Sequence, residues 1–407
     1  MEGLVIGIDL CDSYTHISCM EPELTWVIPT VICKNRTKDD WYVDEEAYTH
    51  ALMGEGVMED KLLAQVTKDG TATIGGVKYN ALYILKMFLK KALEIPRKEA
   101  GTAKIAQMTV TIRNLDTKLM DGLMYCADFL EIPRRCVHII SHTESFIYYV
   151  MSQKREVWSN QVGMFDLSDE TLRYYEMKVL RGTRQMQVMA EYEELEEGVH
   201  LDVLENAAGA KLADKILCSC AERILQKRLY SAIVLTGKGF ENTEWAPEFM
   251  RQICSRRRVF AERSLFARGA LFKARDYLQE KSSYPFVSIC EGRLKTTVSV
   301  KVLSYDKEGP FVMAEAGDNW YESKSTVDFI VSGQKEVEFT ILPLDPKRKK
   351  LVKIGLDSFP DRPDRTTRIQ LSIGFSDEKT MVVAIKDKGF GEIYKATDAL
   401  VKQEVKL

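Results

Sequence analysis

Hydrophobic and polar residues follow two different patterns along the chain, and the change comes near Lys281. Before Lys281, short apolar runs typical of buried strands alternate with segments whose apolar residues recur every three or four positions, as on one helix face. This alternation predicts an α/β domain. We expect strands over residues 4–10, 15–20, 136–140, 162–166, 172–180 and 232–235, and helices over 80–93, 115–129, 142–152, 201–216 and 265–278.

Two of these helices are preceded by residues that favour a helix start. Asn114 is a candidate N-cap for the helix over 115–129. Ser141-His142-Thr143-Glu144 has the form of a capping box, in which the serine accepts from the glutamate backbone and the glutamate reaches back.

After Lys281 the pattern is alternation of apolar and polar residues with almost no helix, which predicts an all-β sandwich. The polar, proline-containing segment 279–285 is typical of a linker, so we place an α/β domain over 1–282 and the sandwich over 283–407. A basic run, 346–350, reads as a solvated loop or as a binding patch. The predicted strands are 298–303, 326–331, 336–341, 367–373 and 380–385.

Composition narrows the class of protein. The 407 residues carry a net charge of −3, which argues against a nucleic-acid binder, and no run approaches the length of a membrane helix. The N-terminus lacks the features of a signal peptide, so we expect a cytoplasmic protein. Nine cysteines without a Cys-x-x-Cys pair and five histidines without metal-type spacing predict buried thiols in a reducing compartment and no zinc site.

Candidate chemistry lies in three turns, over 9–13, 166–171 and 235–240, each directly after an apolar strand. α/β folds bind ligands at the carboxyl ends of their strands. Asp9 and Asp166 occupy the same place in two of these turns, and such a pair can hold Mg²⁺ through water because hard cations prefer oxygen ligands.

Several segments resemble the DnaK-type heat-shock chaperones, a branch of the actin-like ATPase superfamily. Residues 7–10, Gly-Ile-Asp-Leu, are similar to the first phosphate motif, and Phe165-Asp166-Leu167 with Thr171 is similar to the second. The other similar segments are 107–112 and 137–146 (the first connecting region), 233–237 (the adenosine motif), 265–270 (the closing helix) and 383–391 (a stretch of the substrate domain).

The resemblance implies a two-lobed actin/ribonuclease-H-like nucleotide-binding fold, with lobe I over about 1–150 and lobe II over about 151–282. It implies ATP and Mg²⁺ as cofactors, Asp9 and Asp166 as the metal residues that also orient the attacking water, and Lys61 as the loose counterpart of the catalytic lysine. The residues expected at the nucleotide are Asp12, Ser13, Thr171, Thr236, Gly237 and Lys238.

For the sandwich, the resemblance implies a protein or peptide partner held by edge-strand pairing and apolar pockets. The candidate contacts are loops around 311–313 and 319–321, although Trp320 could equally fill the sandwich core. Gly389-Phe390-Gly391 is expected to form a turn between the last two strands.

The departures from the family pattern concern the same turns. Cys11 replaces a glycine, Asp12 stands where a threonine is usual, and residues 168–170, Ser-Asp-Glu, replace a glycine triplet. A carboxylate 4 Å from a phosphate charge costs about 4 kcal/mol at an effective dielectric near 20, which offsets roughly a thousandfold of affinity. His142 aligns with the usual glutamate, and capping explains the nearby Glu144.

Two larger parts of the chaperones are expected to be missing. The interval from Asp166 to Thr236 is too short for the subdomain that clamps adenine, and the chain ends after the β-domain, where the helical lid would follow.

Three hypotheses follow. The first is a DnaK-like scaffold with a degenerate nucleotide site that binds a protein partner and is not an enzyme. The second is an Mg-ATP-dependent ATPase with an atypical phosphate site, in which Thr171 and Ser13 donate to phosphate oxygens. The third is an actin-like filament former, against which the C-terminal β-domain speaks; a sugar-kinase-like role stays open.

Overall fold

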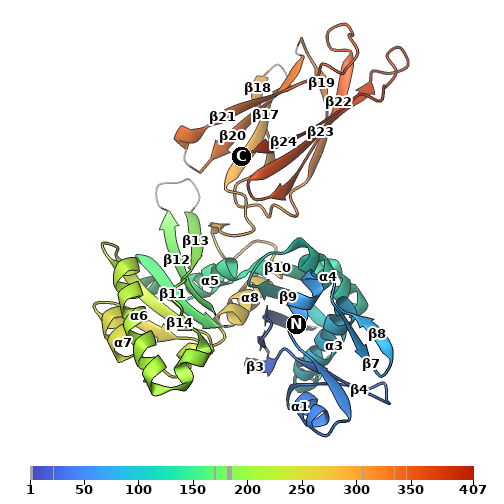
Figure 1. Ribbon diagram of the computed structural model, residues 1–407. Coiled ribbons are helices and arrows are strands. Elements are labelled where there is room, and N and C mark those ends of the chain that lie inside the picture. Colours follow the sequence, from blue (N-terminus) through green and yellow to red (C-terminus); the bar gives the residue numbers. More distant parts are fainter. Residues whose placement is uncertain are drawn as a thin grey trace. The chain divides into compact units, whose positions relative to one another are not determined.

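The computed structural model describes residues 3–21, 23–168, 171–180, 186–304, 307–333, 335–344 and 346–407. The chain divides into two compact units, Met1–Phe286 and Val287–Leu407 (Figure 1). Unit 1 is mixed α/β, and the regular elements of unit 2 are strands and one short 3-10 turn. The sequence placed the division after residue 282, and β16 (Phe286–Ile289) spans the observed one.

The first sheet of unit 1 combines a meander with two parallel strands. Its order is β3 (Leu24–Pro29), β2 (Tyr14–Cys19), β1 (Leu4–Leu10), β9 (Ile105–Ile112) and β10 (Val137–Ser141). β1, β2 and β3 pair antiparallel, whereas β9 and β10 are parallel to β1. Every residue of β1 is buried, as its continuous apolar run predicts.

The second sheet of unit 1 repeats this order. Five of its six strands lie side by side in the order β13 (Met186–Glu194), β12 (Thr171–Leu180), β11 (Gln161–Ser168), β14 (Tyr230–Thr236) and β15 (Arg258–Ala261). β11, β12 and β13 pair antiparallel, and β14 and β15 are parallel to β11. Unit 1 is therefore an internal topological repeat, in which β1 corresponds to β11.

The helices follow the same repeat. One helix precedes the first parallel neighbour in each sheet, one links the two parallel strands, and one follows the last strand. These pairs are α3 (Ala81–Ala100) and α6 (Ala207–Leu225), α4 (Thr117–Phe129) and α7 (Pro247–Cys254), and α5 (His142–Met151) and α8 (Leu265–Asp276).

Smaller elements complete unit 1 between β3 and α3. They are β4 (Ile32–Asn35), β5 (Trp41–Val43), α1 (Asp44–Leu52), β6 (Gly56–Glu59), α2 (Leu62–Thr67), β7 (Thr71–Ile74) and β8 (Val77–Asn80).

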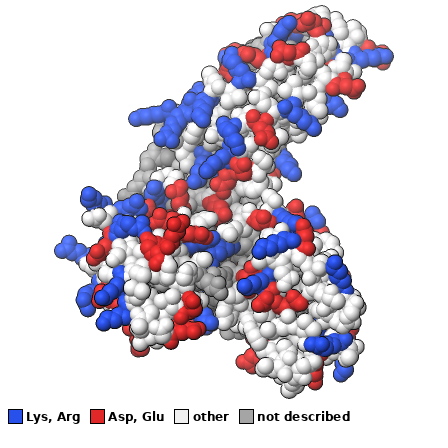
Figure 2. Space-filling model, in the orientation of Figure 1, with Lys and Arg blue, Asp and Glu red and all other residues white. Residues whose placement is uncertain are grey.

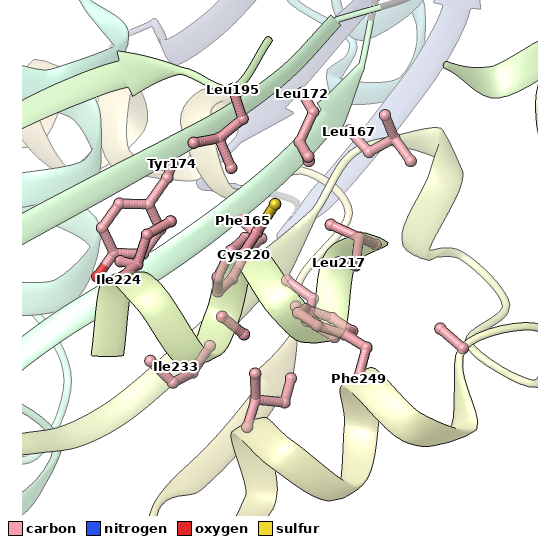
Figure 3. Packing of buried hydrophobic residues seen from close by; sticks show 14 of the residues in the cluster. Phe165, Leu167, Leu172, Tyr174, Leu195, Leu217, Cys220, Ile224, Ile233 and Phe249 are labelled. Atoms are coloured by element: carbon pink, nitrogen blue, oxygen red, sulfur yellow. The ribbon is translucent and has the colours of Figure 1, made fainter. Parts of the chain in front are cut away.

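A hydrophobic core lies between the second sheet and the helices α6 and α7 (Figure 3). Leu217 and Cys220 from α6 and Phe249 from α7 pack against Phe165 of β11. Phe165 and Phe249 are fully buried and contact edge to face, with ring centroids 5.2 Å apart. Burying one such side chain contributes about 1.5–3 kcal/mol relative to leaving it exposed.

Helices α5 and α8 cross between the two sheets because glycines let the backbones approach. A Cβ on Gly269 of α8 would overlap the carbonyl oxygen of Ser145 in α5. A Cβ on Gly7 of β1 would likewise overlap the backbone of α8 at Ala267 and Leu271. Close packing here holds α8 against both α5 and β1.

Two predicted helix starts were wrong. α4 begins at Thr117, and Asp116 caps it by accepting from the Leu119 N–H at 2.9 Å, so Asn114 is not the N-cap. α6 begins at Ala207 because the Asn206 side chain accepts from the Gly209 N–H at 2.7 Å. The segment Leu201–Glu205 before it forms a 3-10 turn.

The remaining helix predictions of unit 1 are confirmed with small shifts in their ends. α3 extends seven residues past the expected end at 93, α5 covers the expected 142–152 to within one residue, and α8 ends at Asp276. At α5 the Ser141 hydroxyl accepts from the Glu144 N–H at 3.2 Å, as the capping box predicts.

Unit 2 contains two four-stranded antiparallel sheets that share one core. The first has the order β18-β17-β20-β21 and the second β19-β22-β23-β24. Buried residues from both sheets, among them Phe339 and Leu371, belong to one cluster. The strands are β17 (Thr296–Ser304), β18 (Lys307–Ala314), β19 (Ser325–Val331), β20 (Glu336–Pro343), β21 (Lys350–Gly355), β22 (Thr367–Asp377), β23 (Thr380–Gly389) and β24 (Leu400–Lys406).

All five strands expected in this part are present, while β18, β21 and β24 were missed. Phe311–Met313 was expected in a loop but lies in β18. Trp320 is 9% exposed and belongs to the core, which decides between the two alternatives for this residue. Phe390 and Gly391 follow the end of β23 at Gly389, so the expected turn is observed.

Charged side chains are mixed on the surface. On the face drawn in Figure 2, Lys and Arg are interspersed with Asp and Glu over both units. The basic run of the sequence contains a short 3-10 turn, Pro346–Arg348, between β20 and β21. Among the described residues, no helix is long and apolar enough to cross a membrane.

Candidate functional site

The repeated topology places Asp9 and Asp166 at corresponding positions of β1 and β11. Both side chains are buried, with 7% and 0% exposure of the residues. In register, Asp9 lies beside Thr111 of β9, and Asp166 lies beside Thr236 of β14. The negative charge of Asp9 contributes to raising the pKa of Asp166. The structure thus brings together the two aspartates that the sequence singled out.

Asp9 is engaged by side chains from two other positions. The His142 Nε2 lies 2.8 Å from its Oδ1, and the Cys11 thiol donates to the same oxygen at 3.4 Å. The imidazole stacks on the Phe266 ring with centroids 3.8 Å apart, so its orientation is held. Burial by itself would raise the pKa of Asp9, but the charge and hydrogen bond of His142, together with the charge of His16 and the Cys11 hydrogen bond, outweigh it and leave that pKa below its ordinary value.

Asp166 is engaged by a permanent cation. The Arg113 guanidinium, on the residue directly after β9, lies 3.6 Å from its Oδ2 and donates to the Ser168 carbonyl at 3.2 Å. The Ser168 hydroxyl donates to Oδ1 at 2.5 Å. Burial is the largest influence and raises the pKa of Asp166, and Arg113 and Ser168 offset it only in part.

Asp12 and Lys61 belong to the start of α2. The Asp12 carboxylate accepts from the Leu63 N–H at 2.8 Å and from the Ala64 N–H at 3.2 Å. Such a bond satisfies backbone groups that the first helical turn leaves unpaired. Lys61 directly precedes α2 with a left-handed backbone, φ 49°. Asp12 was expected at the nucleotide, and here its carboxylate is committed to a helix end.

The other residues expected at the nucleotide line both sheet ends. Thr171 opens β12, and its hydroxyl is buried without a hydrogen-bond partner among the described residues. The Thr236 hydroxyl donates to the Glu262 carbonyl at 2.8 Å. Ser13 is exposed in the turn after β1, and its carbonyl accepts from the Thr30 N–H.

Gly237 directly follows β14 and lies against the end of β11. It has φ +90°, and a Cβ there would overlap Leu167 and Ser168. Lys238, next in the chain, donates to the Tyr14 hydroxyl at 3.4 Å and lies 5.3 Å from the centre of that ring. Asp169 and Glu170, the carboxylates expected to repel a phosphate, lie outside the described residues.

Three contacts connect the two sheets beside the aspartates. Arg113 and Lys238 provide two of them. The third is Arg173, which is 3% exposed and donates to the Arg113 carbonyl and to the Asn114 side chain at 3.2 and 3.1 Å. Asn114, expected to cap a helix, instead accepts from this guanidinium.

The residues present do not fit the Mg²⁺-nucleotide that the resemblance implies. Mg²⁺ prefers oxygen donors, so it does not take the imidazole and thiol that bond to Asp9 Oδ1 as ligands, and Asp166 is paired with the Arg113 guanidinium. Each positive charge of the ion placed about 4 Å from the guanidinium would cost about 4 kcal/mol at an effective dielectric near 20.

Four residues around the aspartates were not predicted as a group. His142, Cys11 and Arg113 contact an aspartate, and Arg173 contacts Arg113. The available signal was position, because Arg113 directly follows β9, just as Cys11 follows β1 and Gly237 follows β14. A search restricted to strand-end residues in parallel neighbours would have included Arg113. Arg173 lies inside β12 and carries no such signal.

The comparisons with known families agree with the division into units. Residues 13–291 match a model described as Family of unknown function (DUF5716) C-terminal. Residues 293–407 match a second model, Domain of unknown function (DUF8552). Since the first match covers more than half of the 407 residues, the chain belongs to the DUF5716 C-terminal family. A search of curated proteins gave no match.

Proposed function

We propose that this protein is a DnaK-like scaffold, an actin-like α/β frame with a β-sandwich, that binds a protein or peptide partner without using Mg-ATP. The observation that carries the proposal is that both aspartates expected to hold Mg²⁺ are engaged by side chains of the protein itself. Asp9 bonds to His142 at 2.8 Å, and Asp166 pairs with Arg113 at 3.6 Å.

The doubled topology of unit 1 supports the frame. An internal repeat of an antiparallel meander followed by two parallel strands, with an aspartate at the end of each first strand, agrees with the fold that the resemblance implies. Helices α5 and α8 contact each other, and α8 packs on β1. The sandwich supports the partner, because edge strands such as β18 and β21 leave backbone groups available for an extended peptide.

A second candidate, the ATPase with an atypical phosphate site, is favoured by a different observation. The hydroxyls of Thr111 and Thr171 are buried without hydrogen-bond partners among the described residues, and Asp166 Oδ2 has the ion pair with Arg113 at 3.6 Å but no hydrogen bond among them. Buried polar groups without a partner cost about 1–3 kcal/mol each, and a bound phosphate with its water would satisfy them. The two candidates differ in whether Asp9 and Asp166 bind Mg-ATP.

Calorimetry with Mg-ATP tests the proposal. We expect no heat with the purified full chain at millimolar nucleotide, and the same for Asp9→Ala. Micromolar binding that Asp9→Ala abolishes would refute the scaffold and establish the second candidate. Arg113→Ala serves as a gain-of-binding comparison, since removing the guanidinium frees the carboxylate of Asp166.

A peptide screen tests the partner half of the proposal. Fluorescence anisotropy with a library of extended peptides would be measured on the full chain, with and without Mg-ATP. We expect the scaffold to bind a subset with the same affinity in both conditions. Affinities that change when nucleotide is added would show that nucleotide controls the β-domain and would contradict the proposal.

A further inference from the structure

Three donor groups of different chemistry meet at the end of β1. The Asp9 Oδ1, Cys11 Sγ and His142 Nε2 lie 2.8 Å (oxygen to nitrogen), 3.4 Å (oxygen to sulfur) and 3.9 Å (sulfur to nitrogen) apart. All three donors lie within 4.8 Å of one another. They come from a strand, the turn after it and the first residue of α5, and His142 is more than 130 positions from the other two in the chain.

These separations are close to those of a tetrahedral zinc site. Zinc binds carboxylate oxygen and imidazole nitrogen at about 2.0–2.2 Å and thiolate sulfur at about 2.3 Å. At tetrahedral angles, the ligand atoms are then about 3.3–3.6 Å apart. The three observed distances differ from this range by about half an ångström or less, so only a small adjustment of the donors is required.

The surroundings hold the donors in position. The Cys11 N–H donates to the Tyr14 carbonyl at 3.3 Å, which closes the turn after β1. The Ser141 cap fixes the start of α5 and with it His142, whose ring is stacked on Phe266. Cys11 is partly exposed, whereas Asp9 and His142 are buried, so an ion would enter from the Cys11 side.

We propose that Asp9, Cys11 and His142 bind one Zn²⁺ ion, with water or an external ligand as the fourth donor. Thiolate and imidazole select zinc and related transition metals, whereas Mg²⁺ and Ca²⁺ prefer oxygen donors. On binding, the Cys11 thiol releases its proton and the sulfur becomes a thiolate ligand. The proton between His142 Nε2 and Asp9 Oδ1 also leaves Nε2, so that a neutral ring protonated at Nδ1 offers the Nε2 lone pair to the ion. The hydrogen bonds that Cys11 and His142 now make to Asp9 are replaced by bonds to the ion.

The proposal goes beyond the proposed function and does not depend on it. The scaffold requires only that Mg-ATP does not bind, whereas this site concerns a different ion and requires no nucleotide. The two can fail separately, because the nucleotide titration is carried out on chelator-treated protein with Mg²⁺ alone.

Cobalt and zinc titrations of the chelator-treated full chain test the site. Co²⁺ reports its ligands, because a cobalt–thiolate bond gives a charge-transfer absorption band and tetrahedral coordination gives visible bands. We expect both with one equivalent of Co²⁺, and their loss when one equivalent of Zn²⁺ is added. Cys11→Ser should abolish the charge-transfer band, and His142→Asn and Asp9→Asn should weaken binding at least tenfold.

Controls separate this site from adventitious binding. Cys254→Ser removes an exposed thiol, and His50→Asn alters a partly exposed histidine that pairs with Glu55; neither should change the titration. The proposal is overturned if the folded wild-type protein shows no cobalt–thiolate band, or if Cys254→Ser removes the band while Cys11→Ser retains it. The absence of the band in the wild-type protein refutes the proposal by itself, so the test does not depend on whether every variant folds.

Discussion

The ion pair between Arg362 and Asp387 in unit 2 gives a sharp prediction about stability. Asp387, in β23, is fully buried and accepts from the Arg362 Nη1 and Nη2, both at 2.7 Å. The Gly389 N–H, the Thr397 N–H and the Thr397 hydroxyl complete its partners at 2.7–2.9 Å. The Arg362 side chain is only 5% exposed, so solvent screens this pair little.

Replacing Arg362 by Met removes the cation but keeps an apolar stem of similar length. The variant leaves a buried carboxylate with three neutral donors, and breaking such a pair from one side costs about 3–5 kcal/mol. The matched control is Arg365→Met, three residues along, because the Arg365 side chain is 69% exposed and its contact to Asp364 at 3.9 Å is a surface pair. Surface pairs contribute about 0–1 kcal/mol.

The pH dependence distinguishes loss of charge pairing from loss of packing. Burial would raise the pKa of Asp387, but Arg362 and the other donors outweigh it and hold that pKa well below its ordinary value. A lowered carboxyl pKa contributes stability that is present above the unfolded value of about 3.9 and is lost as the pH falls through the folded pKa. The destabilisation by Arg362→Met should therefore be largest near pH 7 and shrink below about pH 4.

The loss of stability is measured by denaturant unfolding, with hydrogen exchange of peptides from β22 to β24 as the readout for unit 2. Peptides from α5 serve as the internal reference for unit 1. We expect the free energy of unfolding of unit 2 to fall by about 3–5 kcal/mol in Arg362→Met and by less than about 1 kcal/mol in the control. Equal unfolding midpoints for the two variants, or a difference that does not change with pH, would show that the pair does not stabilise the unit.

Two further predictions concern the frame around the site. Gly269→Ala places a methyl group into the Ser145 carbonyl and should destabilise unit 1 by about 1–3 kcal/mol or more in thermal unfolding. Gly122→Ala meets only side-chain methyl groups of Leu82 and Val66, at 3.1 and 3.6 Å, and should cost less; equal costs would contradict the close packing of α5 on α8. Asp12→Ala removes the bond to the Leu63 N–H and should lower the stability of α2 by about 1 kcal/mol. We expect faster hydrogen exchange in α2 alone, and unchanged exchange there would contradict the capping role of Asp12.

Local signals in the sequence predicted most of the elements. The apolar run 4–10 is the fully buried strand β1, and Ser141 caps α5 as its spacing to Glu144 predicts. Where two side chains competed for a cap, the prediction was wrong, because Asp116 rather than Asn114 reaches the Leu119 N–H. The strands β18, β21 and β24 were missed because their apolar residues do not alternate regularly with polar ones, and they are recognised only by pairing with their neighbours.

The candidate site shows the same limit more clearly. The strand-end positions of Asp9 and Asp166 could be predicted, because a continuous apolar run marks each strand and its end. Their partners could not be predicted from spacing, since Cys11 and His142 are far apart in the chain and match no metal-ligand pattern. Arg113 meets Asp166 only because the two sheets lie side by side in unit 1.

The sequence by itself determined the local choices of this protein: which segments form strands and helices, where several helices start, and that an α/β part precedes a β part. Those choices depend on periodicity and on bonds between residues a few positions apart. Only the tertiary structure decided that His142 binds Asp9, that Arg113 binds Asp166, and that Cys11 completes a three-donor cluster. Such contacts depend on the parallel pairing of β1, β9 and β10 and on the packing of α5 and α8, which no short stretch of sequence specifies.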